Sequence, residues 1–286
     1  MKKLIAGVDI GGTHVTVSLV DISRGKLING SYVRANVDPS MQKAEIINAW
    51  GNAIRESFCK SGFTVSLVGI AMPGPFDYEN GISFIKNQHK FEHLYGENVK
   101  ESLALNLGIK PGNISLINDA SAFLLGEISC GAGKSYQNIA GITLGTGLGS
   151  ASIIDKKIYE GDLYKMPYKD GCAEDYISAR WLINHYEELS NIKVTGVKNI
   201  ADRFLDDDSS RKAFIEFGEN LASVLIKGFE RQVPEAIIIG GNISLAWNCF
   251  MPTVKKVLEK NKINYLIKRA ELGEAAALIG GSYLWK

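Results

Sequence analysis

A glycine-turned segment near the N-terminus returns in altered form near the middle of the chain. Residues 6–21 read AGVDIGGTHVTVSLVD, and residues 140–155 read AGITLGTGLGSASIID. In each segment two runs rich in β-branched or apolar residues flank a glycine turn, which predicts a β-hairpin. Because one such hairpin stands at the head of each half of the chain, the pattern predicts an internally duplicated architecture.

The rest of the chain alternates between helical and strand-like patterns, which favours an α/β fold. Short apolar runs at 65–72, 114–117 and 237–239 predict buried strands. Helical spacing covers 40–61, 97–107, 120–129, 173–190, 211–231 and 271–285. A length of 286 residues suggests two domains. We expect a small α/β domain of residues 1–117 plus the C-terminal helix at 270–286, and a larger α/β domain of residues 118–269.

Composition argues against several classes of function. The formal net charge is +1, so there is no concentrated basic surface of the kind that nucleic acids or anionic membranes attract. The four cysteines are far apart, which argues against a disulfide framework. No run approaches the roughly 20 apolar residues of a transmembrane helix, and Asp9 interrupts the first apolar run too early for a signal peptide. We therefore expect a cytoplasmic protein without nucleic-acid or membrane partners.

The first glycine turn is a candidate phosphate site. Gly11 and Gly12 leave backbone N–H groups open to a ligand, because no Cβ obstructs its approach. Thr13 adds a hydroxyl donor, and Asp9 at the strand end can hold Mg²⁺ through water, since this ion takes few carboxylates. Taken alone, the turn is equally consistent with an ordinary hairpin.

The second glycine turn has the same character. Gly145, Thr146 and Gly147 again combine small residues with a hydroxyl group, and again a plain hairpin turn is an equal alternative. Two such turns in one chain favour a clamp for the phosphates of a nucleotide. Neither turn is a dinucleotide fingerprint, which requires G-x-G-x-x-G at the start of a helix.

Two further strand ends carry polar or glycine residues. Asn118 and Asp119 stand between a predicted strand and a predicted helix. Asp119 is either the helix N-cap, which is the commoner role there, or a general base for an attacking hydroxyl group. Gly240 and Gly241 follow the strand at 237–239 and form either a turn or a flat surface for adenosine.

Six motifs in this order resemble the ROK family of sugar kinases, in the actin-like ATPase and hexokinase superfamily. The resemblance covers nearly the whole chain. It implies a two-domain actin-like ATPase (ribonuclease H-like) fold with an interdomain cleft, an ATP- and Mg²⁺-dependent glucokinase-type activity on a hexose or hexose derivative, and a possible homodimer. The motifs are GVDIGGTHVTVSLVD (7–21), GIAMPGPFDYENG (69–81), LINDASAFLLGE (116–127), GITLGTGLGSASI (141–153), GCAEDYISA (171–179) and IIIGGNIS (237–244).

The resemblance also implies a role for each candidate residue. Asp119 would be the base that activates the sugar hydroxyl group. Asn118 and Glu174 would hold other sugar hydroxyl groups, and Gly74 would line the sugar pocket. Asp9 and the two glycine turns would bind Mg-ATP, and Gly240 with Gly241 would flank the adenosine. Without the resemblance, Glu174 reads as an ordinary glutamate in the first turn of a helix.

One segment departs from the family pattern. Many relatives carry a Glu-x-Gly-His sequence and a zinc-binding cysteine cluster here, whereas residues 160–174 read EGDLYKMPYKDGCAE. Cys172 is its only cysteine, and one thiol cannot supply the four ligands of a structural zinc site, so we predict no zinc. Lys165, Tyr168 or Lys169 could occupy the space of the missing histidine, and Glu160 could replace the glutamate.

This departure leaves alternatives to a glucose kinase. N-acetylhexosamines, mannose, fructose and β-glucosides remain candidate substrates. A non-catalytic, sugar-binding regulator of the same family is the alternative from a different class. Regulators of the family carry a DNA-binding helix-turn-helix ahead of the first motif, and here that motif begins at Gly7, so we expect no such module.

Overall fold

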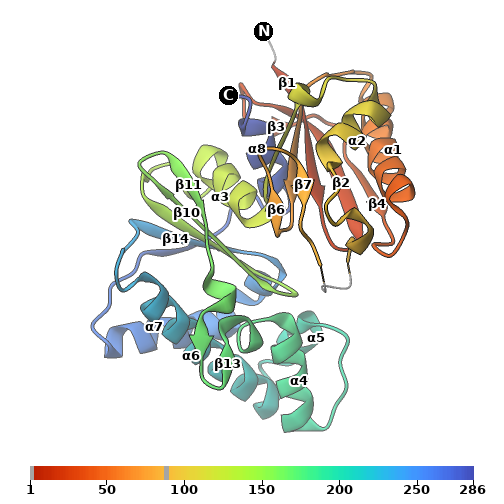
Figure 1. The fold of residues 1–286 in the computed structure, drawn as a ribbon. Helices are drawn as coiled ribbons and strands as arrows, with labels where there is room; N and C mark the ends of the chain where they lie inside the picture. Colours follow the sequence, from red (N-terminus) through yellow and green to blue (C-terminus); the bar gives the residue numbers. More distant parts are fainter. Residues whose placement is uncertain (1–2, 87–89) are drawn as a thin grey trace. The chain divides into compact units, whose positions relative to one another are not determined.

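The computed structural model describes residues 3–86 and 90–286, which form two compact units (Figure 1). Unit 1 runs to Lys134 and resumes at Glu274, whereas unit 2 spans Ser135–Gly273. Each unit has its own central sheet and its own hydrophobic core. No helix in the described ranges is both long enough and apolar enough to cross a membrane.

The sheet of unit 1 is built on the first glycine-turned hairpin. Strands β1 and β2 pair antiparallel, and β5 and β8 extend the sheet parallel to β1, in the order β3-β2-β1-β5-β8, with β4 also paired to β2. The strands are β1 (Leu4–Ile10), β2 (His14–Asp21), β3 (Lys26–Leu27), β4 (Val33–Asn36), β5 (Val68–Met72) and β8 (Ile114–Asn118). A separate two-stranded sheet consists of β6 (Phe76–Asp77) and β7 (Ile82–Ser83).

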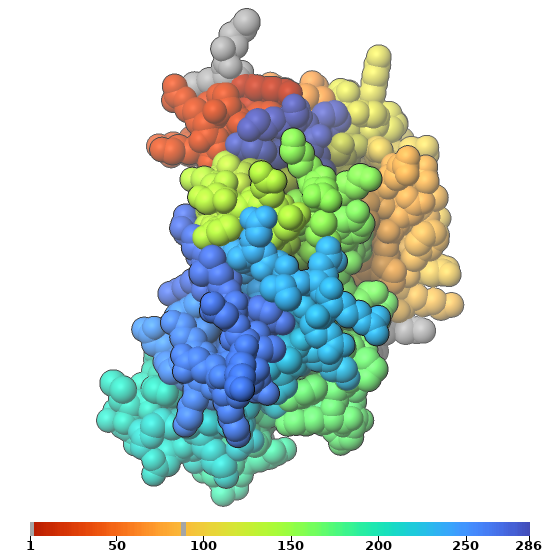
Figure 2. All heavy atoms as spheres, turned by 90° about the vertical axis from the view of Figure 1, so that its left-hand side faces the viewer, coloured from red at the N-terminus to blue at the C-terminus, as the bar shows by residue number. Residues whose placement is uncertain are grey.

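Helices cover both faces of this sheet. Because successive residues of a strand point to opposite faces, Val8 contributes to the core that includes Trp50, whereas Gly7 faces Leu278. Figure 2 shows the C-terminal segment in dark blue lying beside the N-terminal strands in red. The helices are α1 (Lys43–Ser61), α2 (Val99–Leu107), α3 (Asp119–Cys130) and α8 (Ala275–Tyr283), with short 3₁₀ turns η1 (Glu92–Leu94) and η2 (Pro111–Asn113).

Glycines allow α8 to lie close to its neighbours. A Cβ at Gly69 of β5 would lie 2.0 Å from the carbonyl oxygen of Gly281, and a Cβ at Gly280 would lie 1.8 Å from that of Ala122 in α3. Both contacts are far shorter than any real Cβ contact, so a larger residue would push the backbones apart. The two glycines reduce the helix propensity of α8, but they permit it to pack on both the sheet and α3.

The sheet of unit 2 repeats the arrangement of unit 1. Strands β9 and β10 form the second glycine-turned hairpin, and the order β11-β10-β9-β14-β15 has the same antiparallel and parallel pairings as β3-β2-β1-β5-β8. The duplicated architecture expected from the sequence is therefore present in the strand order. The strands are β9 (Ile139–Leu144), β10 (Leu148–Ile154), β11 (Lys157–Glu160), β14 (Ala236–Gly240) and β15 (Ile267–Arg269).

The helices of unit 2 form its core together with one face of the sheet. Phe217 and Leu221 of α6 are fully buried against sheet residues such as Ile142. The helices are α4 (Ala179–Ser190), α5 (Val197–Ala201), α6 (Asp208–Phe229) and α7 (Trp247–Lys260). A short hairpin of β12 (Pro167–Tyr168) and β13 (Gly171–Cys172) and 3₁₀ turns η3 (Leu163–Lys165), η4 (Ala173–Asp175) and η5 (Asn242–Ala246) complete the unit.

Two expectations differ from the structure in detail. The continuous helix predicted over 173–190 is wrong, because η4 ends at Asp175 and α4 begins only at Ala179. The Ser178 side chain accepts a hydrogen bond from the Trp181 N–H and so starts a new helix there. Contacts also group α3 with unit 1, whereas the sequence analysis placed it in the second domain. The predicted division into domains of residues 1–117 with 270–286 and of residues 118–269 stays a prediction.

Candidate active site

The carboxyl ends of three parallel strands bring several candidate residues of unit 1 to one edge of its sheet. Asp9 of β1 lies beside Ala71 of β5, and Met72 of β5 lies beside Asn118 of β8. Asp119 follows directly as the first residue of α3. Ligands of open α/β sheets bind at this edge, so the topology alone marks it as a candidate site.

Asp9 lies in an environment that disfavours its negative charge. Burial, followed by the nearby negative charges of Asp119 and Glu274, raises the pKa of Asp9 from 3.8 to about 7, although Arg34 partly opposes the shift. A carboxylate whose charge is so poorly compensated fits a cation. Among residues 3–86 and 90–286, no group of three or more His, Cys, Asp or Glu side chains could hold a metal. The single, largely buried carboxylate of Asp9 fits an ion such as Mg²⁺, which takes few protein ligands and keeps most of its waters.

Asn118, and not Asp119, caps helix α3. The Asn118 Oδ1 accepts hydrogen bonds from the backbone N–H groups of Ala120 at 3.0 Å and Ser121 at 3.2 Å. The alternative in which Asp119 serves as the cap is therefore wrong. Asp119 occupies the first helical position, and its side chain remains accessible to solvent.

The Asp119 carboxylate is suited to accept a proton. Although solvent reaches its side chain, protein atoms surround Asp119 on most sides, and this partial desolvation raises its pKa above the ordinary value, against the opposing effects of the Ala120 N–H group and of Lys90. The Ala120 N–H lies 2.8 Å from Oδ1. A base works best when its pKa is close to the ambient pH, so the direction of this shift favours proton transfer.

Tyr78, which was not among the residues predicted from the sequence, connects two of the predicted substrate residues. Its hydroxyl group donates to the Met72 carbonyl at 3.0 Å and accepts from Nδ2 of Asn118 at 3.3 Å. A Cβ at Gly74 would lie 3.1 Å from the same hydroxyl oxygen. The only available signal was its place in the motif GIAMPGPFDYENG. Because capping occupies Oδ1 and Tyr78 accepts one N–H of Nδ2, the Asn118 side chain offers its second N–H to a ligand.

The first glycine turn of unit 1 is closed by backbone and packed by one imidazole. The Gly11 N–H donates to the His14 carbonyl at 2.9 Å. A Cβ at Gly11 would lie 2.6 Å from Cε1 of His14, so the ring packs on the turn. Gly12 has open space around it, where the nearest atom to an added Cβ would be the Lys90 side chain at 3.8 Å, and Thr13 is exposed. A ligand therefore has access to this backbone.

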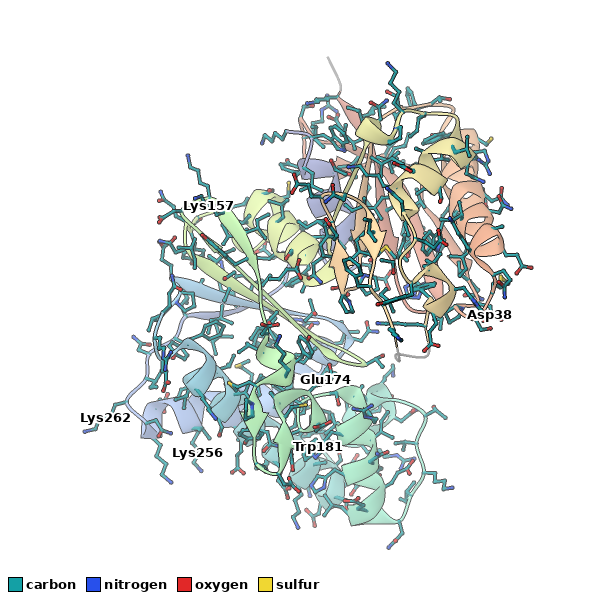
Figure 3. All side chains as sticks on the ribbon, viewed as in Figure 1. Asp38, Lys157, Glu174, Trp181, Lys256 and Lys262 are labelled. Carbon is teal, nitrogen blue, oxygen red and sulfur yellow. The ribbon has the colours of Figure 1, made fainter. Side chains whose placement is uncertain are left out.

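The second glycine turn, in unit 2, carries Glu174 against it. The Gly145 N–H donates to the Gly147 carbonyl at 3.0 Å, and Thr146 lies between them. The Glu174 Oε2 accepts from the Leu148 N–H at 2.8 Å, and a Cβ at Gly147 would lie 2.5 Å from this oxygen. The structure thus brings together Leu148 and Glu174, which lie 26 positions apart in the sequence. Glu174 belongs to η4, which follows β13 and precedes α4 in the chain, and it is labelled in Figure 3.

Gly240 and Gly241 lie at the end of β14 in unit 2. Gly241 has φ of 83°, and a Cβ there would lie 2.3 Å from the Leu144 carbonyl oxygen. The Ser244 hydroxyl group donates to the Gly241 carbonyl at 2.7 Å. Backbone conformation and close packing are therefore sufficient reasons for glycine at 241, and its contact with adenosine stays a prediction.

The side chains of the shortened segment face several directions. Lys165 pairs with Asp162 at the surface, at 2.8 Å. Tyr168 and Lys169 instead donate to Oδ1 of Asn220 on α6, at 3.1 and 2.8 Å. Glu160 ends β11. Tyr168 and Lys169 are thus engaged with α6, whereas Glu174 contacts the glycine turn.

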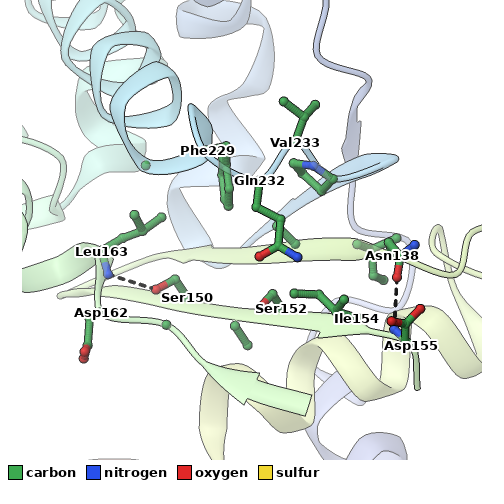
Figure 4. A pocket seen from close by; sticks show the side chains of 16 residues that line it. Asn138, Ser150, Ser152, Ile154, Asp155, Asp162, Leu163, Phe229, Gln232 and Val233 are labelled. Atoms are coloured by element: carbon green, nitrogen blue, oxygen red, sulfur yellow. Dashed lines mark hydrogen bonds between the residues drawn. The ribbon is translucent and has the colours of Figure 1, made fainter. Parts of the chain in front are cut away.

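A cavity of about 340 Å³ lies in unit 2 at the other end of the β9–β10 hairpin (Figure 4). Ser150 and Ser152 of β10 line one side of it, and Phe229 and Gln232 line the other. None of the candidate residues derived from the sequence lines this cavity. It is separate from the glycine turn that holds Glu174.

The family model described as "ROK family" matches residues 5–163 and 167–286. The break at 164–166 falls within the shortened segment. A glucokinase of Thermotoga maritima is 28% identical over 323 aligned positions, which cover 100% of this chain and 98% of that protein. An N-acetyl-D-glucosamine kinase of Histophilus somni is 24% identical, and 98% of each chain is covered.

Solved structures agree on the fold. A ROK family glucokinase from Streptomyces griseus, in complex with glucose and AMPPNP, has a TM-score of 0.79 and 24% identity, with 99% of each chain covered. A ROK family transcriptional regulator, a homologue of the E. coli MLC protein, has a TM-score of 0.81 and 16% identity. The match covers 98% of this chain and 76% of that one. The expected α/β actin-like ATPase fold is confirmed.

Proposed function

Since the chain belongs to the ROK family, we propose that it is an ATP-dependent kinase that phosphorylates a hydroxyl group of a hexose or hexose derivative. Relatives along almost the whole chain are named glucokinase or N-acetyl-D-glucosamine kinase, which supports sugar kinase activity. The observation that carries the proposal is the state of Asp119. Asn118 caps helix α3, so the Asp119 carboxylate is not needed for that role. The Asp119 carboxylate is accessible to solvent, and its pKa is raised.

Asp119 is assigned the role of base. It would accept the proton of the attacking sugar hydroxyl group as the phosphoryl group is transferred. Such a transfer depends mostly on positioning and charge neutralisation, so a carboxylate is sufficient as the base. Asn118 would donate an N–H to a neighbouring sugar hydroxyl group, since its Oδ1 is already engaged.

Glu174 is assigned to the sugar through its second carboxylate oxygen. Oε2 is engaged by the Leu148 N–H, and within the described residues no hydrogen bond is found for Oε1. A carboxylate oxygen accepts strong hydrogen bonds from hydroxyl groups. We therefore assign to Glu174 both a sugar hydroxyl group and the glycine turn, and Gly74 beside Tyr78 to the wall of the sugar pocket.

ATP is assigned to the glycine turns and to the glycines that follow β14. The backbone at Gly11, Gly12 and Thr13 and at Gly145–Gly147 offers N–H groups to phosphates. Gly240 and Gly241 would flank the adenosine. Mg²⁺, when bound, neutralises phosphate charge, and Asp9 would hold it through water. We place the reaction in the cytoplasm, where ATP and imported sugars meet.

Glucose is the first candidate substrate and N-acetylglucosamine the second, because these are the sugars in the names of the relatives. The shortened segment lacks the histidine that many family members carry, and it leaves Glu174 against the glycine turn. We therefore expect a preference among hexoses that differs from that of relatives with the longer segment.

The test is a coupled assay of ADP release with Mg-ATP and a panel of sugars. The panel contains glucose, mannose, fructose, N-acetylglucosamine, N-acetylmannosamine and a β-glucoside. Asp119→Asn serves as the control, because the substitution is nearly isosteric and removes the base. Sugar-dependent ADP release that disappears in this variant would establish the activity and identify the substrate.

The opposite result is equally informative. If no sugar stimulates ADP release from a folded protein that still binds ATP, the kinase proposal is wrong. The non-catalytic sugar-binding regulator would then be favoured, and equilibrium binding of the same panel would test it.

A further inference from the structure

The hairpin that leads into Glu174 is too small to be stable alone. Strands β12 and β13 contribute two residue pairs, Pro167 with Cys172 and Tyr168 with Gly171. Two-stranded hairpins are at best marginally stable in water even when they are longer. Lys169 at its tip adopts φ of 52°, which is uncommon for a residue with a side chain. Other contacts must therefore hold this hairpin in place.

Asn220 of α6 provides such contacts. Asn220 is 3% exposed. Its Oδ1 accepts hydrogen bonds from Lys169 Nζ at 2.8 Å and from Tyr168 Oη at 3.1 Å. Its Nδ2 donates to the Tyr176 carbonyl at 3.4 Å. One buried amide thus binds residues on both sides of Glu174. A buried polar group must be hydrogen-bonded, so these partners are strongly favoured over solvent.

The ammonium group of Lys169 also lies between two aromatic rings. Nζ is 4.8 Å from the centroid of Tyr176 and 5.5 Å from that of Tyr168, and the two rings meet edge to face at 5.4 Å. Cations are attracted to aromatic faces at these distances. The Tyr176 hydroxyl group also donates to Asp170 at the hairpin tip. Asn220, Lys169, Tyr168 and Tyr176 together form what we call the Asn220 anchor.

The position of Glu174 depends on this anchor. Glu174 lies two residues after the hairpin and two residues before Tyr176, and the fully buried Ala173 precedes it directly. The Ala173 N–H donates to the Met166 carbonyl at 2.9 Å, which closes the segment around the hairpin. From here Oε2 of Glu174 reaches the Leu148 N–H. A shift of the hairpin on α6 would displace this carboxylate from the glycine turn.

We infer that the Asn220 anchor is a positioning device, which sets Glu174 against the Gly145–Gly147 turn and thereby fixes the sugar contact. The inference rests on the proposed function for the role of the sugar. It assigns no chemical step to the anchor residues, which act through Glu174. Asn220, Lys169, Tyr168 and Tyr176 are positioning residues.

The first measurement needs no substrate and no activity. Hydrogen exchange of the intact, unliganded protein is compared between wild type, Lys169→Met and Asn220→Leu. Amides of residues 163–176 should exchange at least about tenfold faster in both variants, with exchange in α6 and in the sheet of unit 2 unchanged. Lys212→Met is the matched control, because Lys212 is an exposed lysine on α6, the helix that carries Asn220. Lys169→Arg keeps a cation and donors, and should restore most of the protection.

The second measurement is kinetic, with the sugar that gives the highest turnover. Lys169→Met should raise the KM for the sugar by about tenfold and leave the KM for ATP within about twofold, because the anchor acts on the sugar contact.

The two measurements separate the anchor from the kinase activity. If the wild-type protein shows no sugar-dependent ADP release, the proposed function fails, and hydrogen exchange alone decides whether the anchor orders the segment. Unchanged exchange at 163–176 in Lys169→Met would overturn the anchor. If Asn220→Leu does not fold, Lys169→Met, which replaces an exposed residue, still decides. A rise in KM that Lys169→Arg fails to reverse would also overturn it.

Discussion

The two glycine-turned hairpins stand at corresponding places in two sheets with the same strand order, yet their turns differ. In unit 1 the last pair is Ile10 with Val15, which leaves four residues in the turn. In unit 2 it is Leu144 with Leu148, which leaves three. When the first strands, β1 and β9, are aligned residue for residue at the constant spacing of the sequence repeat, the second strands, β2 and β10, pair with them one residue apart.

The shift changes what the corresponding side chains do. A displacement of one residue moves a strand's side chains to the opposite face. His14 aligns with Leu148 in the sequence repeat, but its imidazole packs on Gly11, whereas Leu148 enters the core of unit 2. The Leu148 N–H binds Glu174. The two hairpins thus share their strand order, but different side chains pack against their turns.

The charge at the two turns differs as well. Beside the first turn, the negative charges of Asp119 and Glu274 disfavour that of Asp9, which suits a site that meets a cation. In the repeat, Asp9 aligns with Thr143, so the second hairpin lacks this carboxylate. There Glu174 arrives from a separate segment and binds backbone. The comparison predicts that proton transfer and cation binding depend on the carboxylates of unit 1. It predicts that the position of the sugar depends on Glu174 of unit 2.

The largest expected effect separates Asp119 from Glu174. Asp119→Asn should lower kcat by about 10³-fold, because general-base catalysis contributes roughly 10²–10⁴-fold. Glu174→Gln keeps an acceptor for the Leu148 N–H but weakens the contact with the sugar. It should raise the KM for the sugar by about tenfold with kcat nearly retained. Steady-state kinetics of both variants are the measurement. Equal losses of kcat in the two variants would contradict the division of roles.

A comparison of two glycines in unit 2 should separate packing from ligand access. Gly241→Ala should lower the free energy of unfolding by about 3 kcal/mol, because its φ is 83° and the new Cβ meets the Leu144 carbonyl. Gly145→Ala should change stability by less than about 1 kcal/mol, since an added Cβ there meets no atom within 4 Å. Urea unfolding measures both.

In nucleotide binding, by contrast, Gly145→Ala should have the larger effect of the two variants. Gly145→Ala places a methyl group where the proposal puts a phosphate, so its KM for ATP should rise while its fold is intact. If Gly145→Ala binds ATP as the wild type does, the second turn is an ordinary hairpin turn.

Much of the fold was predictable from the sequence because its signals are local. The glycine turns, the buried strand runs and the helical spacing identified β1, β2, β5, β8, β14 and most helices close to their observed bounds. The break at Ser178 was missed because an apolar periodicity continues across it. The register shift was missed because strand pairing, and not the order of residues, determines it.

The sequence was sufficient to predict many residues of the candidate site, but not which hydrogen bonds join them. Spacing placed Asn118 and Asp119 at the strand end, but which of them caps α3 depends on a backbone angle and a side-chain rotamer. The links from Tyr78 to Asn118 and from Asn220 to Lys169 join residues about 40 and 50 positions apart. No local pattern encodes such contacts, because they exist only once the chain has folded.

The charge comparison also predicts a pH dependence of stability that belongs to unit 1. The pKa of Asp9 is raised from 3.8 to about 7, so between these values the folded protein binds more protons than the unfolded chain. The free energy of unfolding therefore falls as pH rises from about 4 to 7, and the loss is complete above pH 7. A shift of about three pK units corresponds to about 4 kcal/mol, and the partial solvent exposure of Asp9 reduces this to roughly half. Without Mg²⁺, Asp9→Asn should therefore be more stable than wild type by about 2 kcal/mol at pH 8, and equally stable at pH 4.

Urea unfolding at the two pH values, with and without Mg²⁺, measures this effect. Thr143→Val at the corresponding place in unit 2 is the control, and its difference from wild type should not depend on pH. A stability gain of Asp9→Asn that is as large at pH 4 as at pH 8 would show that burial of a polar group, and not of a charge, is responsible.

The smallest expected effect compares an exposed ion pair in each unit. Arg34 pairs with Glu274 at 3.2 Å in unit 1, and Lys165 pairs with Asp162 at 2.8 Å in unit 2. Exposed pairs contribute little, so neither Arg34→Met nor Lys165→Met should shift the Tm by more than about 2 °C at pH 8. Arg34 nevertheless lowers the pKa of Asp9, so Arg34→Met should extend the pH-dependent loss of stability to higher pH. Lys165→Met should leave the pH profile unchanged, and identical profiles for the two variants would mean that Arg34 does not act on Asp9.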